Sequence, residues 1–382
     1  MMTAQPSSRD SVIDWLKGIS IIFVLIWHFQ PIQINYHFPK QTSERLVGYL
    51  IHIINTQILC LAVPTFILIS LYLFISKIQN LSFSDGRRRL FSRSVRMFSL
   101  YFFYLAVQFI IFFSFRHLTP EFNVLSLNPT SCNTASIDNL SFILENLFSG
   151  GPSLPVVGYS VLYFLLDLAI LTIISFLFNL LYCFNKNAGR IIFSAVILLT
   201  LILFELSPFF KHTIYAHQIE NFILYVPIAL IWVCYRDRFL SNRNLYFMGY
   251  LLFSLHDLLL DKYGFRGEMY SRISIVFGAL TFISFAYYYF SKNIISLNPE
   301  IHFMSSHSLG IFAIHKYSML MLAFIFEKIG DVVHQKPDWE YTIFIGDIRF
   351  RIIVFFLSIL SVWLTIAFVG YLGKTKLKPL VM

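Results

Sequence analysis

Residues 14–29 read DWLKGISIIFVLIWHF, an almost continuous apolar stretch that nevertheless carries Asp14, Lys17 and His28. A bilayer span needs about 20 mostly apolar residues, and ionisable groups inside one are costly, so each marks a functional candidate. On an α-helix, Lys17 and His28 lie about three turns apart, roughly 16 Å along the axis and on nearly the same face. Asp14 lies one turn below Lys17, the partner we expect for it. We therefore predict a membrane helix with one functional face.

Simpler interpretations exist for each of these side chains. Lys17 can extend its ammonium group to the membrane surface, and His28 can sit at the opposite surface beside Trp27. The placement of Lys17 and His28 on the same helix face favours a functional role over these simpler interpretations. Lys17 also interrupts the apolar run and no small-residue cleavage site follows His28, so we expect a retained helix and not a cleaved signal peptide.

The composition of the chain excludes an ordinary soluble protein. Of 382 residues, 57% are hydrophobic and 13% are charged, whereas soluble domains carry about 25% charged residues. Apolar runs of about 20 residues recur along the chain, which predicts an all-α, polytopic transmembrane helical bundle and a single integral membrane domain over residues 1–382. The net charge of +9 comes from cations in short loops, a pattern that orients membrane proteins and does not indicate nucleic-acid binding.

The four cysteines predict neither a disulfide nor a metal site. Cys60, Cys183 and Cys234 lie in or beside apolar runs, Cys132 lies alone in a polar loop, and no CxxC spacing occurs. We expect them to be small buried side chains.

About ten spans are predicted, with both termini in the cytoplasm of a multi-pass cell-membrane protein (the inner membrane, if the source is bacterial). They cover residues 14–29, 46–75, 98–115, 159–182, 191–206, 222–235, 245–260, 273–289, 306–326 and 352–372. The basic segment between the second and third spans is predicted to be a cytoplasmic loop, which directs His28 to the outer side. Pro64 predicts a kink or break in the second span. The polar residues 116–154 are expected to form an outer loop.

The spacing Lys17-x10-His28 resembles the opening motif of the acyltransferase-3 superfamily. Members of that family are integral membrane enzymes that transfer acetyl or other short acyl groups from cytoplasmic acyl-CoA to sugars, glycans and related acceptors. In the family the histidine is regarded as essential, and the cation separated from it by ten residues, Arg or Lys, supports the acyl donor.

Four further stretches resemble segments of this family and follow in family order. They are VPTFILISLYLF (63–74), RSVR (93–96), LYFLLDL (162–168) and HSLGIFAIH (307–315). The chain departs from the usual pattern at three positions. Leu71 stands where Gly is usual, Ser99 stands where a Pro often follows the RxxR pair, and Tyr163 stands where Trp is usual.

The resemblance implies an O-acyltransferase whose catalytic candidates are His28, Ser70 and His315. An imidazole titrates near neutrality, so His28 is the expected general base that takes the proton of an acceptor hydroxyl. Ser70 is either an oxyanion donor or bonds a backbone carbonyl in a kinked helix. His315 is either a hydrogen-bonded core residue or a residue that contacts substrate.

Lys17, Arg93 and Arg96 are the candidates for holding the phosphates of the donor, for which Arg is well suited. Alternatively, the arginines of this basic segment only set the orientation of the chain in the membrane, and we favour this interpretation for Arg87, Arg88 and Arg89. The expected donor is acyl-CoA, with acetyl-CoA foremost, and no metal is expected. The expected acceptor is a sugar, glycan or glycolipid precursor, as in O-acetylation during polysaccharide biosynthesis at the cell envelope.

A transporter or flippase is the competing class, since polar residues inside spans also mark transport pathways. In that interpretation His28, His256 and His315 form a proton relay. Against it, no matched pair of broken helices occurs in two halves of the chain. For His256 and Asp257 themselves we expect a polar pair at a helix end that faces the outer loop. Consumption of acyl-CoA would separate the two classes.

Overall fold

The computed structural model describes residues 10–28, 50, 53–118, 146–147, 151–152, 162–206, 219–261, 270–332 and 348–381. Within these ranges the chain is helical and contains no strand. Six helices there are long and apolar enough to cross a membrane, and three shorter apolar helices accompany them. The predicted all-α, polytopic helical bundle is therefore confirmed, while the number of ten spans and the cytoplasmic termini stay predictions. Most of the predicted outer loop 116–154, including Cys132, lies outside the described residues.

The chain divides into two compact units. The first comprises residues 1–24, 52–95 and 167–308, and the second comprises residues 25–51, 96–166 and 309–382. Three long helices contribute residues to both units: α1 (Ser11–His28), α4 (Phe83–Leu118) and α6 (Tyr163–Phe184).

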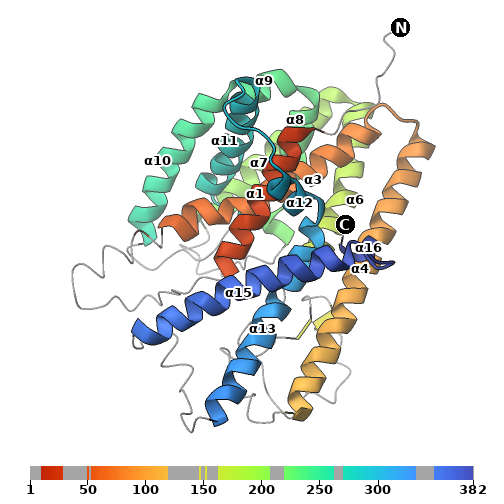
Figure 1. Cartoon of the computed structure of the whole chain (residues 1–382). Helices are drawn as coiled ribbons and strands as arrows, with labels where there is room; N and C mark the ends of the chain where they lie inside the picture. Colours follow the sequence, from red (N-terminus) through yellow and green to blue (C-terminus); the bar gives the residue numbers. More distant parts are fainter. Residues whose placement is uncertain are drawn as a thin grey trace. The chain divides into compact units, whose positions relative to one another are not determined.

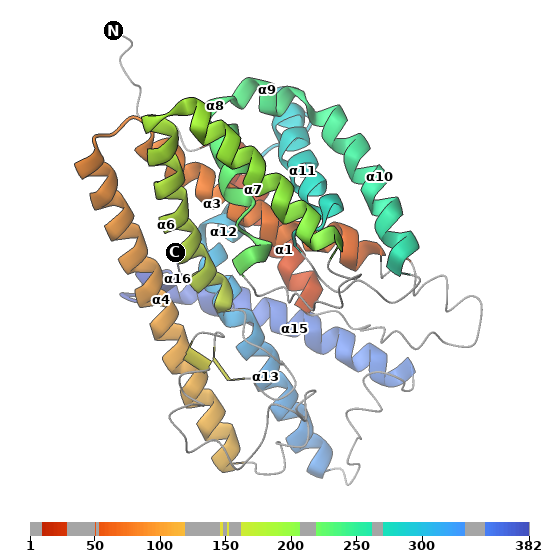
Figure 2. The same ribbon diagram turned by 180° about the vertical axis from the view of Figure 1, so that it is seen from behind.

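The first unit is built from helices that pack closely along their length. Its further elements are η1 (Ile54–Ile58), η2 (Leu59–Leu61), α3 (Ala62–Ile78), α7 (Lys186–Leu206), η5 (Ile219–Asn221), α8 (Tyr225–Cys234), α9 (Arg236–Ser241), α10 (Arg243–Asp261), α11 (Ile273–Ser291) and α12 (Pro299–Ser306). Figures 1 and 2 show α10 beside α11 from both sides. Two glycines allow this approach, because a Cβ at Gly249 would lie 2.7 Å from the Phe277 ring, and one at Gly278 would lie 2.9 Å from the Tyr250 ring. Small residues at helix contacts are typical of membrane bundles.

The second predicted span is irregular at its start, as the proline predicted. Residues 54–58 form a π-helical turn and residues 59–61 a 3₁₀ turn before α3 begins at Ala62. Pro64 lies in the first turn of α3, where its missing N–H costs little.

The prediction of a loop in the basic segment is wrong, because this segment is helical, while its cytoplasmic side stays a prediction. Helix α4 begins at Phe83 and includes all the arginines from Arg87 to Arg96. Arg is a good helix former, and Pro is absent here. Ser82 caps the helix: its Oγ accepts from the Asp85 backbone N–H at 3.2 Å and donates to the Asp85 carboxylate at 2.6 Å.

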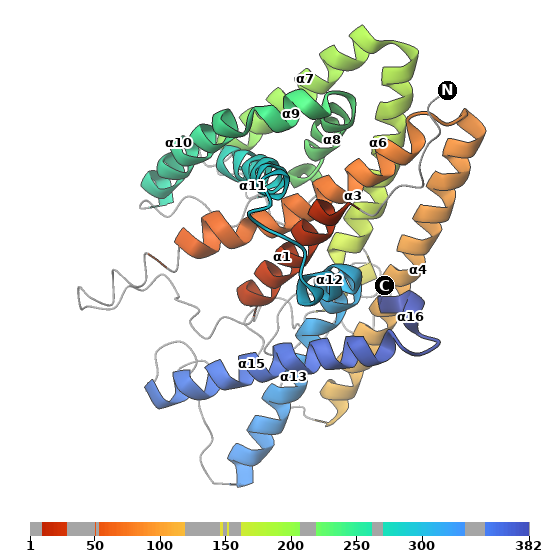
Figure 3. The same ribbon diagram turned by 45° about the horizontal axis from the view of Figure 1, so that its top comes forward.

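The second unit contains α13 (Ser308–Val332), α15 (Ile348–Leu372) and α16 (Lys378–Val381), together with its parts of α1, α4 and α6. Figure 3 shows α15 crossing α13, and Thr365 of α15 donates a hydrogen bond to Ser318 of α13 at 2.8 Å. On α13, Tyr317 also donates to Gln108 of α4 at 2.7 Å. A Cβ at Gly310 would lie 2.6 Å from Val381, so α16 closes against the start of α13.

Candidate functional site

Two predicted catalytic residues meet inside the second unit. The rings of His28, at the end of α1, and His315, on α13, have their centroids 4.9 Å apart and are inclined by 41°. The His315 side chain is completely buried, and that of His28 is partly buried. They come from positions nearly 290 residues apart in the chain, so the fold and not local sequence brings them together. Two imidazolium charges at this separation would repel strongly, which makes the pair suited to holding one proton.

Backbone carbonyl groups determine the tautomer of His315. Its Nδ1 lies 2.7 Å from the Phe312 carbonyl oxygen and 3.1 Å from the Ile311 carbonyl oxygen. A carbonyl can only accept a hydrogen bond, so Nδ1 carries the proton. In the neutral ring, Nε2 is then the nitrogen with the lone pair. The two backbone carbonyl groups thus orient the ring so that Nε2 can accept a proton.

Aromatic and amide side chains connect α13 to neighbouring segments of the same unit. Phe312, one turn before His315, packs against Phe164 at the start of α6, with ring centroids 4.9 Å apart. Gln108 of α4 accepts from Tyr317 and donates to the Pro152 carbonyl oxygen at 2.8 Å. The sequence resemblance at residues 162–168 and 307–315 therefore involves segments that contact one another. These contacts hold α13 against α4 and α6.

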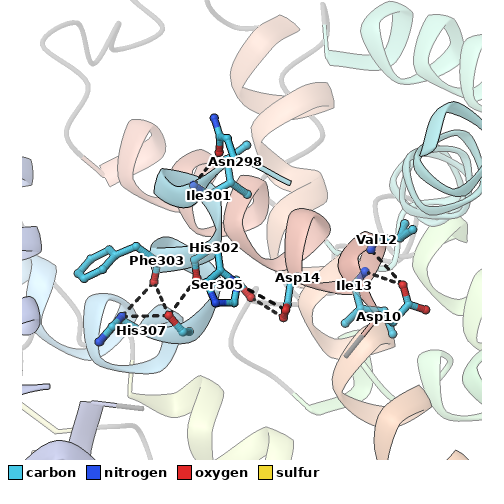
Figure 4. A network of polar contacts seen from close by, with 11 residues as sticks. Asp10, Val12, Ile13, Asp14, Asn298, Ile301, His302, Phe303, Ser305 and His307 are labelled. Atoms are coloured by element: carbon cyan, nitrogen blue, oxygen red, sulfur yellow. Dashed lines mark hydrogen bonds and ion pairs between the residues drawn. The ribbon is translucent and has the colours of Figure 1, made fainter. Parts of the chain in front are cut away.

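The beginning of α1 carries a separate polar network, within the first unit (Figure 4). Asp10 caps the helix, since its Oδ1 accepts from the backbone N–H of Val12 at 3.0 Å. Asp14 is buried; its carboxylate accepts from the Ser305 hydroxyl at 2.9 Å, and its Oδ2 lies 3.7 Å from His302 Nδ1. Both partners belong to α12, and the pairing of Asp14 with Lys17 that the sequence suggested stays a prediction.

Helix α12 is pressed against α1 at a glycine. A Cβ added at Gly18 would lie 2.5 Å from Ile301 Cγ2 and 2.6 Å from the Ile301 carbonyl oxygen. Lys17 is the next residue, on the same turn of α1, and its side chain is half-buried. The predicted donor-binding cation is thus held on a helix that α12 and the Asp14 network fix in place.

Ser70 and Arg93 lie together in the first unit. The Arg93 Nη2 donates to Ser70 Oγ at 2.7 Å, and its Nε donates to Thr172 Oγ1 at 3.2 Å. The guanidinium also lies over the Phe74 ring, 5.1 Å from its centroid. Arg93 therefore links α4 to α3 and α6, which gives it a structural role that the sequence did not indicate.

Arg96 differs from Arg93 in exposure. It lies one turn further along α4 and its side chain is exposed, as are those of Arg87, Arg88 and Arg89. Of the two arginines in the RSVR motif, Arg96 is thus the more accessible to a ligand.

The expectation for His256 and Asp257 is half wrong. His256 is indeed exposed, but Asp257 is 1% exposed and accepts a hydrogen bond from Ser274 of α11. Arg272, also 1% exposed, lies nearby, with Nη1 3.9 Å from the Asp257 Oδ2. Sequence reasoning missed Arg272, although a cation next to an apolar run was the available signal. His256 belongs to the first unit, whereas the histidine pair belongs to the second.

The comparison with known proteins agrees with the family resemblance of the sequence motifs. The acyltransferase-3 family model, described as an acyltransferase domain, matches residues 10–370, which is nearly the whole chain. No curated protein and no solved structure matches the chain. The match includes both units and every predicted site residue. This chain therefore belongs to the acyltransferase-3 family, and it is a multi-pass membrane acyltransferase.

Proposed function

We propose that the protein transfers a short acyl group, foremost acetyl, from acyl-CoA to a hydroxyl of a sugar, glycan or glycolipid precursor. The observation that carries this proposal is the close pair of His28 and the buried His315 in a chain of the acyltransferase-3 family. Acyl transfer to a hydroxyl needs a base at the acceptor oxygen, and an imidazole, which titrates near neutrality, meets that need.

In the proposed reaction His28 is the general base. It takes the proton of the acceptor hydroxyl as the hydroxyl oxygen attacks the thioester carbonyl carbon, and a carbon–oxygen bond forms. The carbon–sulfur bond then breaks, and the proton passes from His28 to the leaving thiolate. His315, held in one tautomer by the carbonyl groups of Ile311 and Phe312, orients the adjacent ring and shares its charge.

The donor is proposed to enter with its phosphates at the cations near the predicted cytoplasmic side. Arg96 is exposed and can engage a phosphate with two N–H groups at once. Arg93 is engaged by Ser70 and Thr172, so its proposed share is to hold α4 in position. The roughly 16 Å between Lys17 and His28 along α1 suits a long, thin pantetheine arm with phosphates at one end and the thioester at the other.

Glycan analysis tests the proposal in cells. Surface glycans and glycolipids are compared by mass spectrometry between cells that carry the wild-type gene, the gene with His28→Ala, and no gene. We expect an added acyl group only with the wild-type protein. The matched control is His256→Ala, which removes an exposed histidine of the other unit and is expected to leave the acyl group in place. A proton-relay transporter would instead lose its function in both variants, and purified protein would leave acetyl-CoA unconsumed.

A further inference from the structure

A second buried polar cluster lies in the first unit, where α10 ends and α11 begins. It consists of Gln57 on the π-helical turn, Asp257 on α10 and Arg272 at the start of α11, each about 1% exposed. The histidine pair belongs to the other unit, and the proposed reaction uses none of these three residues. Charged and amide groups buried in a membrane bundle are costly, and such groups usually serve a function.

The guanidinium of Arg272 is only partly satisfied. Its Nη2 donates to the Thr56 carbonyl oxygen at 3.2 Å, and its Nη1 lies 3.9 Å from Asp257, beyond hydrogen-bonding distance. Over the described part of the chain, neither Nε nor Nη1 hydrogen-bonds to any residue. Two buried N–H-bearing nitrogens are therefore available to acceptor oxygens.

Gln57 presents a third such nitrogen and is itself held firmly. Its Oε1 accepts from Ser254 at 2.9 Å, and its backbone carbonyl accepts from Tyr250 at 2.9 Å. These two partners and Asp257 recur at helical spacing on one face of α10. The Gln57 Nε2 hydrogen-bonds to no residue among those described. Gln57 also lies on a π-helical turn, and such turns occur often at functional sites.

The charges and donors of the cluster select the chemistry of a ligand. Arg272 and Asp257 balance one another, so an anion would add an uncompensated charge in a low-dielectric interior. An apolar ligand would leave three buried nitrogens without acceptors. A hydroxyl group can accept from these nitrogens and donate to the Asp257 carboxylate. A neutral molecule with several hydroxyl groups thus meets every requirement of the cluster.

We propose that Gln57, Asp257 and Arg272 form a binding site for a neutral polyhydroxylated ligand, of which a sugar ring is the representative. The segment that links α10 to α11 is predicted to lie on the outer side, so the ligand would enter from there. The acceptor's sugar is the natural occupant only if the proposed function holds, and the binding site itself does not depend on acyl transfer.

Binding is measured without acyl-CoA by saturation-transfer difference NMR on the full protein in phosphatidylcholine nanodiscs. Glycoside detergents are avoided because their sugar head groups would compete. The probes are glucose, galactose, mannose and N-acetylglucosamine, with acetate and inorganic phosphate as anionic competitors. We expect saturable binding of at least one sugar and no competition by the anions.

Two variants locate the binding. Gln57→Leu should weaken sugar binding about tenfold, the loss that corresponds to about 1.4 kcal/mol. The double variant Arg272→Met/Asp257→Leu should abolish it, and it removes both charges so that neither is left buried alone. Arg236→Gln is the matched control, since Arg236 also lies near an aspartate, Asp10, at 3.7 Å but is half-exposed. Its binding should equal that of wild type.

Three results would overturn the proposal: no saturable signal from any sugar with wild type, equal binding in wild type and Gln57→Leu, or displacement of the sugar by acetate or phosphate. The first would mean that water alone satisfies these nitrogens. If the double variant fails to fold, Gln57→Leu carries the test. Failure here leaves the acyltransferase proposal standing, because the assay contains no donor, and an inactive His28→Ala protein would still bind the sugar.

Discussion

Substituting Gly18 by alanine tests how closely α12 is seated on α1. The added Cβ would lie 2.5 Å from Ile301 Cγ2 and 2.6 Å from the Ile301 carbonyl oxygen. The Ile301 side chain could adopt another rotamer but its backbone carbonyl cannot, so α12 must move away from α1. Overpacking of this kind costs about 1–3 kcal/mol. The retreat also endangers the bond from Ser305 to the buried Asp14 carboxylate, worth about 1.5–3 kcal/mol.

Alanine favours a helix over glycine by about 1 kcal/mol, which offsets part of this cost. We therefore expect Gly18→Ala to lower the free energy of unfolding by about 1.5–5 kcal/mol, the cost of overpacking and a lost hydrogen bond less that offset. The assay is unfolding by SDS in mixed micelles, followed by tryptophan fluorescence, because Trp15 packs against Phe282 close to the contact.

Gly86→Ala is the matched control for this measurement. Its Cβ would lie 3.2 Å from the edge of the Phe176 ring and near no backbone atom. The ring can give way, so we expect unchanged or slightly higher stability from the gain in helix propensity. If Gly18→Ala were as stable as Gly86→Ala, the close seating of α12 on α1 would be refuted.

Two further substitutions separate donor binding from structure. Arg96→Lys should weaken acetyl-CoA binding about fivefold to tenfold, because Lys keeps the charge but cannot donate two hydrogen bonds to one phosphate. Arg89→Lys should leave the affinity unchanged. Equal affinities of the two variants in isothermal titration would mean that Arg96 only sets the orientation of the chain in the membrane. Ser70→Ala should lower stability by about 1–2 kcal/mol through the lost bond to Arg93, and reduce transfer less than tenfold. A stable Ser70→Ala protein with a 10²–10³-fold slower transfer would instead indicate an oxyanion donor.

Much of the architecture could be predicted because apolar runs dictate membrane helices directly. The first span, residues 14–29, corresponds to α1 almost residue for residue, and Pro64 marked the irregular second span. The basic segment was misjudged because the positive-inside rule concerns charge and says nothing of secondary structure. Arginines favour a helix as readily as they mark a cytoplasmic side, and α4 extends through them.

The contacts of the site depend on tertiary structure and left little trace in the sequence. His28 and His315 were each candidates on their own, but their pairing needs α1 and α13 to meet. Asp14 had an evident neighbour in Lys17, whereas its hydrogen bond to Ser305 joins residues 291 positions apart. Gln57 gave no signal at all, since an amide in an apolar run is easily taken for an interfacial residue.

The acyl-transfer rate of His28→Ala tests the central claim most directly. Membranes that contain the endogenous acceptor are supplied with labelled acetyl-CoA, and incorporation into glycan is measured for wild type and variant. Both proteins are first shown to elute as folded species by gel filtration in detergent. As general base, His28 accounts for about 10²–10⁴-fold in rate, so we predict a loss of that size. A well-folded His28→Ala protein that transfers acetyl at a near wild-type rate would contradict the account.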